Sequence, residues 1–265
     1  MPSSFKISRR GLITGAAVAG SGALLSGCDA FDSVADRSSG LRGFLEGAGN
    51  GLSYRIQRAL IGNHSMAQEF SESEIRQPMR PNGVTRPDDQ TYLGLAANGF
   101  ADYRLQIAGL VEKPASFSLS ELMAMPARTQ VTRHDCVEGW SCIARWTGVP
   151  LGHVLDQAGV KREARYAVFY CLDTIERGLS GEVKYYESID MVDARHPQTI
   201  LAYGMNGQRL PVENGAPLRL RVERQLGYKM AKYVGRIELV DALSPIALGK
   251  GGYWEDRGYE WYAGI

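Results

Sequence analysis

The chain has little of what several classes of protein need. It holds four cysteines in 265 residues, and the closest pair, Cys136 and Cys142, is six positions apart, a spacing that fits no standard zinc site. The motif C-x-x-C-H does not occur, so no c-type haem is expected to be attached to this chain. The formal net charge is only +1, and the basic field typical of nucleic-acid binding is missing. Nucleic acid is therefore not an expected partner.

Long hydrophobic runs are also scarce. The most apolar stretch ends at Leu25, is rich in glycine and alanine, and has the character of a signal peptide rather than a membrane span. The residues before it, Ser8 to Ile13, resemble a twin-arginine export signal. The run ends in Leu-Ser-Gly-Cys, which resembles a lipoprotein processing box. We expect residues 1–28 to be this signal with its box, and acylated Cys28 to anchor the protein on the periplasmic side of the bacterial inner membrane. A plain signal peptide or an uncleaved anchor is the alternative.

The remainder divides by composition. Residues 29–87 are rich in glycine, serine and arginine with weak periodicity, so they are expected to form a tether and a segment that wraps the folded part. Residues 88–265 contain many short apolar or alternating runs, which predict strands. These runs are residues 103–111, 166–172, 200–205, 208–212 and 234–240.

Local signals predict where turns and helices lie. Ser118 and Glu121 form a capping-box pattern that predicts a helix start. Residues 150–158 predict a second short helix that stops at Gly159. Asn206-Gly207 is typical of a tight hairpin turn. Many short strands with few short helices predict an α+β fold with mixed β-sheets.

Cys136 follows a short β-rich run and precedes a glycine and aromatic segment. Most free cysteines are small buried hydrophobes, but a thiolate is also a nucleophile and a ligand for soft metals. A disulfide from Cys171 to either Cys136 or Cys142 is a further alternative. Spacing alone does not decide between these uses.

Two long blocks carry a resemblance to a known family. The segment CVEGWS…WTGVPL, which starts at Cys136, resembles the cofactor-cysteine segment of the sulfite oxidase superfamily. The block from His196 to Val240 is similar to that family's series A-x-H-P…Y-G…L-P…N-G-A-P-x-R-L…G-[YF]-K. The branch it resembles most contains the periplasmic methionine-sulfoxide reductase catalytic subunit. The resemblance implies that residues 88–265 form a sulfite oxidase-like molybdopterin-binding catalytic domain.

The resemblance implies a role for each matching residue. Cys136 matches the molybdenum ligand, and thiolate suits that soft metal. His134 and Glu138, its neighbours, are expected to serve proton delivery. His196 matches a family histidine, whereas His153 is expected to be structural. Positions expected to contact the cofactor are Asn98, Cys171, Asn214, Arg219, Gly227, Tyr228 and Lys229. Without the resemblance, Asn214 would be a turn residue, and Arg219 and Lys229 would be solvated surface.

One departure bears on the reaction. Sulfite-oxidising members carry an arginine-rich segment after the cysteine, and here residues 137–141 are Val-Glu-Gly-Trp-Ser. Glu138 would repel an anion such as sulfite. We therefore expect an exported molybdenum-molybdopterin oxidoreductase that reduces an S-oxide or N-oxide. Its substrate would be a small oxygen donor or protein methionine sulfoxide.

Other readings of the sequence remain. A sulfite-type oxyanion dehydrogenase and a non-catalytic cofactor-binding lipoprotein are the alternatives. In either catalytic case electrons must come from, or go to, a separate protein, such as a haem membrane subunit or a soluble cytochrome.

Overall fold

The computed structural model describes residues 51–265 except 53, 61, 179 and 180. The predicted signal, the lipoprotein box and the tether up to residue 50 lie outside the described residues. The chain divides into two compact units, Met1–Arg55 and Ile56–Ile265, and the second contains the fold discussed below. Within the described residues, no helix combines the length and apolar character needed to cross a membrane.

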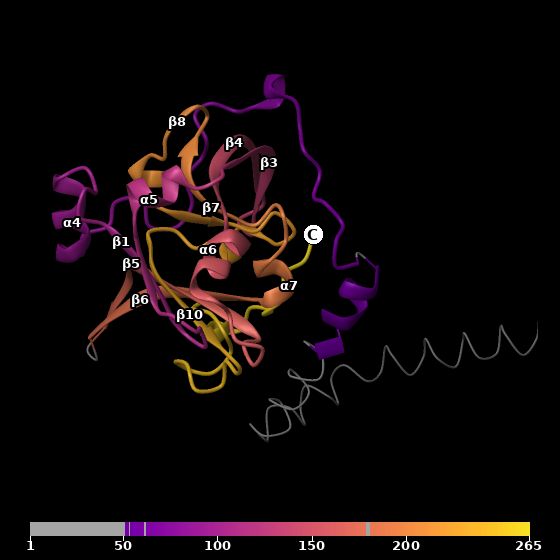
Figure 1. Ribbon diagram of the computed structural model, residues 1–265. Helices are drawn as coiled ribbons and strands as arrows, with labels where there is room; N and C mark the ends of the chain where they lie inside the picture. Colours follow the sequence, from indigo (N-terminus) through magenta and orange to yellow (C-terminus); the bar gives the residue numbers. More distant parts are fainter. Residues whose placement is uncertain (1–50, 53, 61, 179–180) are drawn as a thin grey trace, which may run out of the picture. The chain divides into compact units, whose positions relative to one another are not determined.

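One sheet is mixed and contains five strands in the order β2-β1-β10-β5-β6 (Figure 1). Strand β1 runs parallel to β10, and the other neighbouring pairs are antiparallel. The strands are β1 (Arg104–Gly109), β2 (Ala115–Ser118), β5 (Tyr166–Gly178), β6 (Gly181–Asp190) and β10 (Val234–Val240).

The other sheet is antiparallel, in the order β3-β4-β7-β8, with β9 paired to β7. Its longest feature is the β3–β4 hairpin, in which Arg128 pairs with Gly148 and Cys136 with Trp140. The strands are β3 (Arg128–Cys136), β4 (Trp140–Pro150), β7 (Ile200–Met205), β8 (Gln208–Arg209) and β9 (Arg219–Arg221).

Short helices connect the strands. Among the α-helices of the second unit are α4 (Gln90–Ala97), α5 (Leu119–Ala124), α6 (Leu151–Ala158) and α7 (Met191–Ala194). Short 3-10 helices are η1 (Glu72–Glu74), η2 (Val212–Asn214), η3 (Gly227–Lys229) and η4 (Glu255–Arg257).

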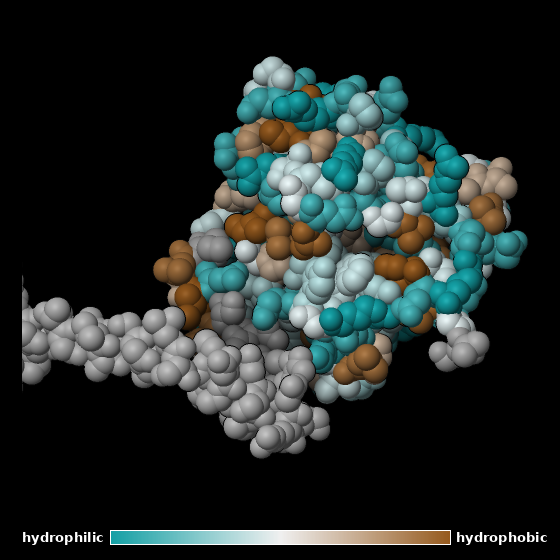
Figure 2. Space-filling view, turned by 180° about the vertical axis from the view of Figure 1, so that it is seen from behind, coloured by the Kyte–Doolittle hydropathy of each residue, from teal (hydrophilic) through white to brown (hydrophobic). Residues whose placement is uncertain are grey.

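The two sheets share one hydrophobic core. It takes Ile107 and Val168 from the mixed sheet and Leu201 and Leu220 from the antiparallel sheet, all essentially without exposure. Helix α6 adds its buried face, which includes Leu155. Burial of large aliphatic side chains is the main stabilising contribution to such a fold. On the face shown in Figure 2, hydrophobic side chains are interspersed among hydrophilic ones.

Local sequence signals are confirmed where the structure allows a comparison. Ser118 and Glu121 form the predicted capping box at the start of α5. Helix α6 ends at Gly159, which has φ +67°, a left-handed conformation that glycine adopts without steric cost. Asn206 and Gly207 have φ values of +49° and +79° and form the predicted β7–β8 turn.

Two strand boundaries differ from the prediction. Strand β5 continues to Gly178, six residues past the predicted end, because it pairs with β6 as far as Gly181. Strand β8 has only two residues. Pro211 follows it and lacks an N–H, and the chain turns into η2 there.

Residues 67–76 lie along the antiparallel sheet. The Phe70 N–H donates to the Val131 carbonyl at 2.9 Å, and the Arg76 N–H donates to the Ile143 carbonyl at 3.0 Å. The Gln198 side chain accepts a hydrogen bond from the Ala67 N–H at 2.7 Å. The limits of the tether and the wrapping segment stay predictions.

Two glycines provide a matched test of the fold. A Cβ on Gly148 would lie 2.2 Å from the Leu201 carbonyl oxygen, at the irregularity between β4 and β7. On Gly152 in α6 the nearest atom would be 3.7 Å away. We expect Gly148→Ala to lower the free energy of unfolding by about 1–3 kcal/mol, and Gly152→Ala to raise it by roughly 0.5–1 kcal/mol. Urea unfolding measures both, and equal effects would contradict the β4–β7 contact.

Candidate functional site

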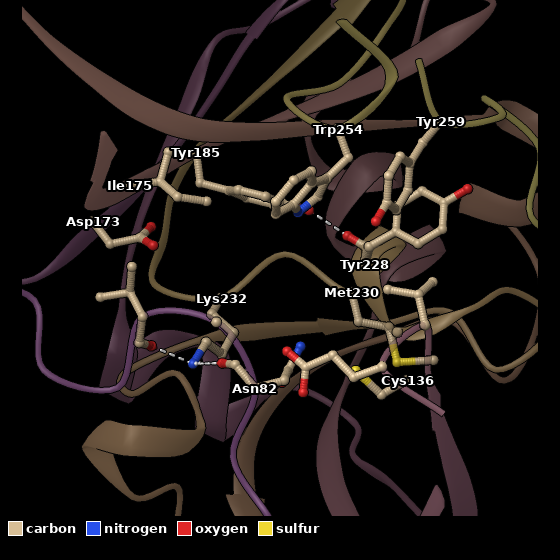
Figure 3. Close-up of a pocket in the computed structure, with 15 residues that line it drawn as sticks. Asn82, Cys136, Asp173, Ile175, Tyr185, Tyr228, Met230, Lys232, Trp254 and Tyr259 are labelled. Carbon is tan, nitrogen blue, oxygen red and sulfur yellow. Dashed lines mark hydrogen bonds between the residues drawn. The ribbon is translucent and has the colours of Figure 1, made fainter. Parts of the chain in front are cut away.

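A pocket of about 280 Å³ opens where the two sheets meet the C-terminal segment (Figure 3). Its wall comes from distant parts of the sequence. Among the lining residues are Asn82 and Val84, Cys136 and Glu138, Asp173 and Tyr185, Tyr228 and Lys232, and Trp254 and Tyr259. The fold therefore brings together residues separated by up to 177 positions in the sequence, from Asn82 to Tyr259.

Cys136 stands at the end of β3 and lines this pocket. Its thiol is free and partly exposed, whereas the other two described cysteines, Cys142 and Cys171, are free and buried. The predicted alternative of a disulfide from Cys171 to Cys136 or Cys142 is therefore wrong for this structure. Burial and the Glu138 carboxylate raise the pKa of Cys136, while the Glu138 N–H and the charges of Arg80 and Arg219 act in the opposite direction. The arrangement presents one thiol to the cavity.

The polar side of the pocket is built around Lys232. Its ammonium group donates to the carbonyl oxygens of Asn82 at 2.6 Å, Glu213 at 2.9 Å and Val84 (Figure 3). Burial, followed by repulsion from Arg219, lowers the pKa of Lys232 to about 7. Burial raises the pKa of Asp173, also in the pocket, to about 6. Two groups in the wall thus change charge near neutral pH.

Arg219 lies behind this polar side. It has no exposed surface, and its guanidinium donates to the Asn214 carbonyl at 3.1 Å and to Asn82 Oδ1 at 3.2 Å. It lies over the Trp146 ring, as does Arg221, at 5.3 and 4.3 Å from the ring centre. Burial, followed by repulsion from Arg221, lowers the pKa of Arg219 to about 9. A buried cation without a carboxylate partner of its own favours an anionic ligand nearby.

Several buried polar atoms near Arg219 have no hydrogen-bond partner within the described residues. They are both amide atoms of Asn214, which is 1% exposed, and Nε of Arg219. Buried polar groups are nearly always paired in native proteins. These orphaned donors and acceptors indicate a place for a polar ligand.

Two positions predicted to contact a cofactor lie elsewhere. Lys229 is fully buried, and its ammonium bonds Glu187 at 2.5 Å and also Glu255. It therefore offers no charge to the pocket, and the lysine in the wall is Lys232. Asn98 is exposed at the end of α4, with its amide donating to Asp102 at 2.5 Å. The asparagine in the wall is Asn82.

His134, predicted to deliver protons, does not line the pocket. Its ring is fully buried behind Gly227, where an added Cβ would lie 2.4 Å from His134 Cε1. Arg221 donates to His134 Nδ1 at 3.1 Å, so Nδ1 is the acceptor and the ring is neutral. Burial, followed by repulsion from Arg219 and Arg221, holds the pKa of His134 well below its ordinary value. This geometry does not support proton delivery by His134.

The remaining predicted positions are distributed as follows. Glu138 lines the pocket and accepts a hydrogen bond from the Trp140 indole at 2.9 Å. Gly227 and Tyr228 also line it. Cys171 is buried in β5, two residues before Asp173. His196 has its Nε2 3.1 Å from the Ser65 carbonyl oxygen.

Among the wall residues that sequence reasoning missed are Asn82, Asp173 and Lys232. Asn82 falls in the segment of weak periodicity, where no local signal marks it. Asp173 comes after the predicted end of its strand. Lys232 did have a signal, because the block GYKMAK holds two lysines and only the first was assigned to the cofactor.

The buried position of Lys229 predicts a structural role. Lys229→Met would leave two carboxyl groups, Glu187 and Glu255, buried without their cation. We expect the free energy of unfolding to fall by about 3–5 kcal/mol. As a control, Arg177→Ala removes an exposed cation that pairs with Asp88, and the expected loss is about 0–1 kcal/mol. Denaturant unfolding compares the two. A Lys229→Met protein as stable as the parent would contradict the buried cluster.

Comparison with known proteins identifies relatives. The family described as "Oxidoreductase molybdopterin binding domain" matches residues 94–246. A putative protein-methionine-sulfoxide reductase subunit YedZ1 of Azospira oryzae is 35% identical over 256 residues, or 97% of this chain and 87% of that protein.

Two further relatives are the catalytic subunits of protein-methionine-sulfoxide reductase MsrP. The protein of Xanthomonas campestris is 38% identical over 151 residues, which cover 55% of this chain and 47% of the relative. The protein of Ralstonia nicotianae is 35% identical over 169 residues, which cover 62% and 50%. The chain thus spans about half the length of these two relatives.

The pocket fits a molybdopterin cofactor. Cys136 supplies a soft ligand. Behind the polar side of the pocket, Asn214 and Arg219 have hydrogen-bonding atoms without a partner within the described residues, and Arg219 carries positive charge that suits a phosphate. From the matched residues and the full-length similarity, the chain belongs to the molybdopterin-binding oxidoreductases and has their sulfite oxidase-like α+β fold.

Proposed function

We propose that this protein reduces S-oxides at a molybdenum ion held by Cys136. The observation that carries the proposal is the composition of the pocket around the free thiol. Tyr185, Tyr228, Trp254 and Tyr259 supply much of the wall, and Glu138 stands where an anionic substrate would need a cation. A neutral substrate with hydrocarbon groups suits such a wall better than an oxyanion does.

The residues of the chain divide the work. Cys136 would bind the metal, and Asn82, Asn214 and Arg219 would hold the polar and phosphate parts of the cofactor. When bound, the cofactor supplies two-electron oxygen-atom transfer. The chain's own contribution is to place the substrate beside it and to exclude competing ligands.

The reaction must balance in protons and electrons. The sulfur–oxygen bond of the substrate breaks, sulfur keeps an electron pair, and oxygen leaves as water after taking up two protons and two electrons. Glu138 is exposed at the pocket, so solvent protons have access there. Because His134 is buried and neutral, solvent beside Glu138 would deliver the protons.

The electrons come from a separate protein in this proposal. The Azospira relative is named as a reductase subunit, which supports a two-protein system. A haem membrane subunit or a soluble cytochrome would serve as the donor. The substrate would be a small oxygen donor or protein methionine sulfoxide. N-oxides share the neutral, polar oxygen and are included as substrates.

A Cys136→Ser substitution tests the metal and the reaction together. We expect the exported protein to hold about one molybdenum per chain, and to reduce methyl sulfoxides with an artificial electron donor at rates well above any oxidation of sulfite. Cys136→Ser should lose nearly all activity and most of the molybdenum, because a hydroxyl is a poor ligand for this metal. Elemental analysis and side-by-side rates provide the measurement.

Cys142→Ala is the matched control. Cys142 lies in β4 and is buried in the same hydrophobic cluster as Trp146. Its replacement by alanine should therefore leave the molybdenum content unchanged. An active Cys136→Ser enzyme would overturn the assignment of the ligand. Sulfite oxidation faster than reduction of every oxide tested would overturn the direction of reaction.

We also propose export by the twin-arginine route and a lipid anchor at Cys28, based on the sequence of residues 8–28. Several acyl chains would hold the protein stably at the membrane. Mass spectrometry of the mature N-terminus is expected to show acylated Cys28, and Cys28→Ser should release the protein from the membrane fraction. An unmodified Cys28 in membrane-isolated protein would refute the anchor.

A further inference from the structure

The pocket has an aromatic wall whose main residues come from the C-terminal segment. The rings of Trp254 and Tyr259 are stacked, with centres 5.2 Å apart and an angle of 29°. Tyr228 meets Tyr259 edge to face at 5.3 Å. Figure 3 shows these three rings together, away from Asp173 and Lys232. The family match ends at residue 246, so Trp254 and Tyr259 lie beyond the matched residues.

This wall is held firmly in place. Glu255, next to Trp254, bonds the buried Lys229. On the other side of Tyr259, the Glu260 carbonyl accepts a hydrogen bond from the Tyr228 hydroxyl at 2.6 Å. Between them, Asp256 accepts from the Tyr186 hydroxyl at 2.5 Å. The residues next to Trp254 and Tyr259 are therefore tied to β6 and η3, which helps to hold the two rings in place.

The chemistry of the wall favours a hydrocarbon group. Ring faces attract C–H bonds and other rings. Each favourable aromatic contact contributes binding free energy beyond that of the buried area alone. The cation in the pocket wall, Lys232, is occupied by three carbonyl oxygens on the polar side. Trp254 is half-buried and Tyr259 is 39% exposed, which leaves ring surface for a substrate at the mouth.

We propose that Trp254 and Tyr259 determine specificity by binding a hydrocarbon arm of the S-oxide. The preferred substrates are then neutral sulfoxides with an aromatic or long alkyl group, over those with two methyl groups. This inference rests on the proposed S-oxide reduction. It adds to that function a site for the part of the substrate that does not react.

Two sulfoxides that differ in one arm test the proposal. Methyl phenyl sulfoxide and dimethyl sulfoxide share the reacting S–O group and differ in one substituent, phenyl or methyl. A loss of activity confined to the first substrate therefore reports on binding of the phenyl group. We expect Trp254→Ala to lower kcat/KM for methyl phenyl sulfoxide about tenfold, through a higher KM. The kcat/KM for dimethyl sulfoxide should change less than about threefold. Trp254→Phe, which keeps a ring, should restore most of the preference. Molybdenum content and thermal stability are measured on every preparation.

A second readout does not depend on turnover. Methyl phenyl sulfone has the same arms and is not expected to be reduced, so its binding to the loaded protein can be measured by calorimetry. We expect about tenfold weaker binding to Trp254→Ala and nearly unchanged binding to Trp254→Phe. Should Trp254→Ala fail to fold, Tyr259→Ala and Trp254→Phe carry the same comparison, since Tyr259 is exposed.

The outcomes separate this inference from the proposed function. Equal losses for both sulfoxides, or sulfone binding unaffected by Trp254→Ala, would overturn the aromatic site while S-oxide reduction stands. A parent enzyme that reduces neither sulfoxide overturns the proposed function and, with it, the role of the wall in specificity. Preference for the aryl substrate that disappears in Trp254→Ala supports both.

Discussion

The buried cluster of Lys229, Glu187 and Glu255 links the parts of the structure on which the pocket depends. Lys229 belongs to η3, which packs against β3, Glu187 belongs to β6 and Glu255 to the C-terminal segment. All three side chains are almost without exposure. Burial, followed by the neighbouring carboxyl of Glu255, raises the pKa of Glu187 well above its ordinary value. A proton retained there leaves one carboxylate facing one ammonium, which is the electrically neutral way to bury the cluster.

Close backbone packing sets the other side of the pocket. Gly227 begins the same turn, and it lies against the His134 ring so closely that no Cβ would fit. His134 is two residues before Cys136 in β3. The turn that begins with Gly227 and ends with Lys229 therefore contacts β3, the strand that ends at Cys136, at one end and, through Glu255, the aromatic wall at the other. In the proposed function, these contacts would set the positions of the cofactor and the substrate relative to each other.

The sequence predicted what short-range physics determines. The α5 capping box, the stop of α6 at Gly159, the Asn206-Gly207 turn and strand β10 depend on a few neighbouring residues, and the structure confirms them. Cys136 was predicted to be the metal ligand because a long block that resembles the family surrounds it, and the structure places it in the pocket wall. Asn82 was not, because its contacts with Arg219 and Lys232 span 137 and 150 positions. The burial of Lys229 was not predicted for a related reason, since the glutamates that enclose it are 42 and 26 positions away.

The arginines of β9 show how burial reverses the meaning of a pattern. Arg219, Leu220 and Arg221 alternate as a half-solvated strand would, yet all three are fully buried. Arg221 is neutralised by Glu223 at 2.6 Å, whereas Arg219 meets two neutral asparagines and Trp146. The fold thus keeps one uncompensated cation next to Lys232 and the orphaned amide of Asn214. Arg219 is therefore buried positive charge behind one side of the pocket, whereas Trp254 and Tyr259 line another side with aromatic rings. In the proposed function, the charge would suit the anionic part of the cofactor and the rings would suit a neutral substrate.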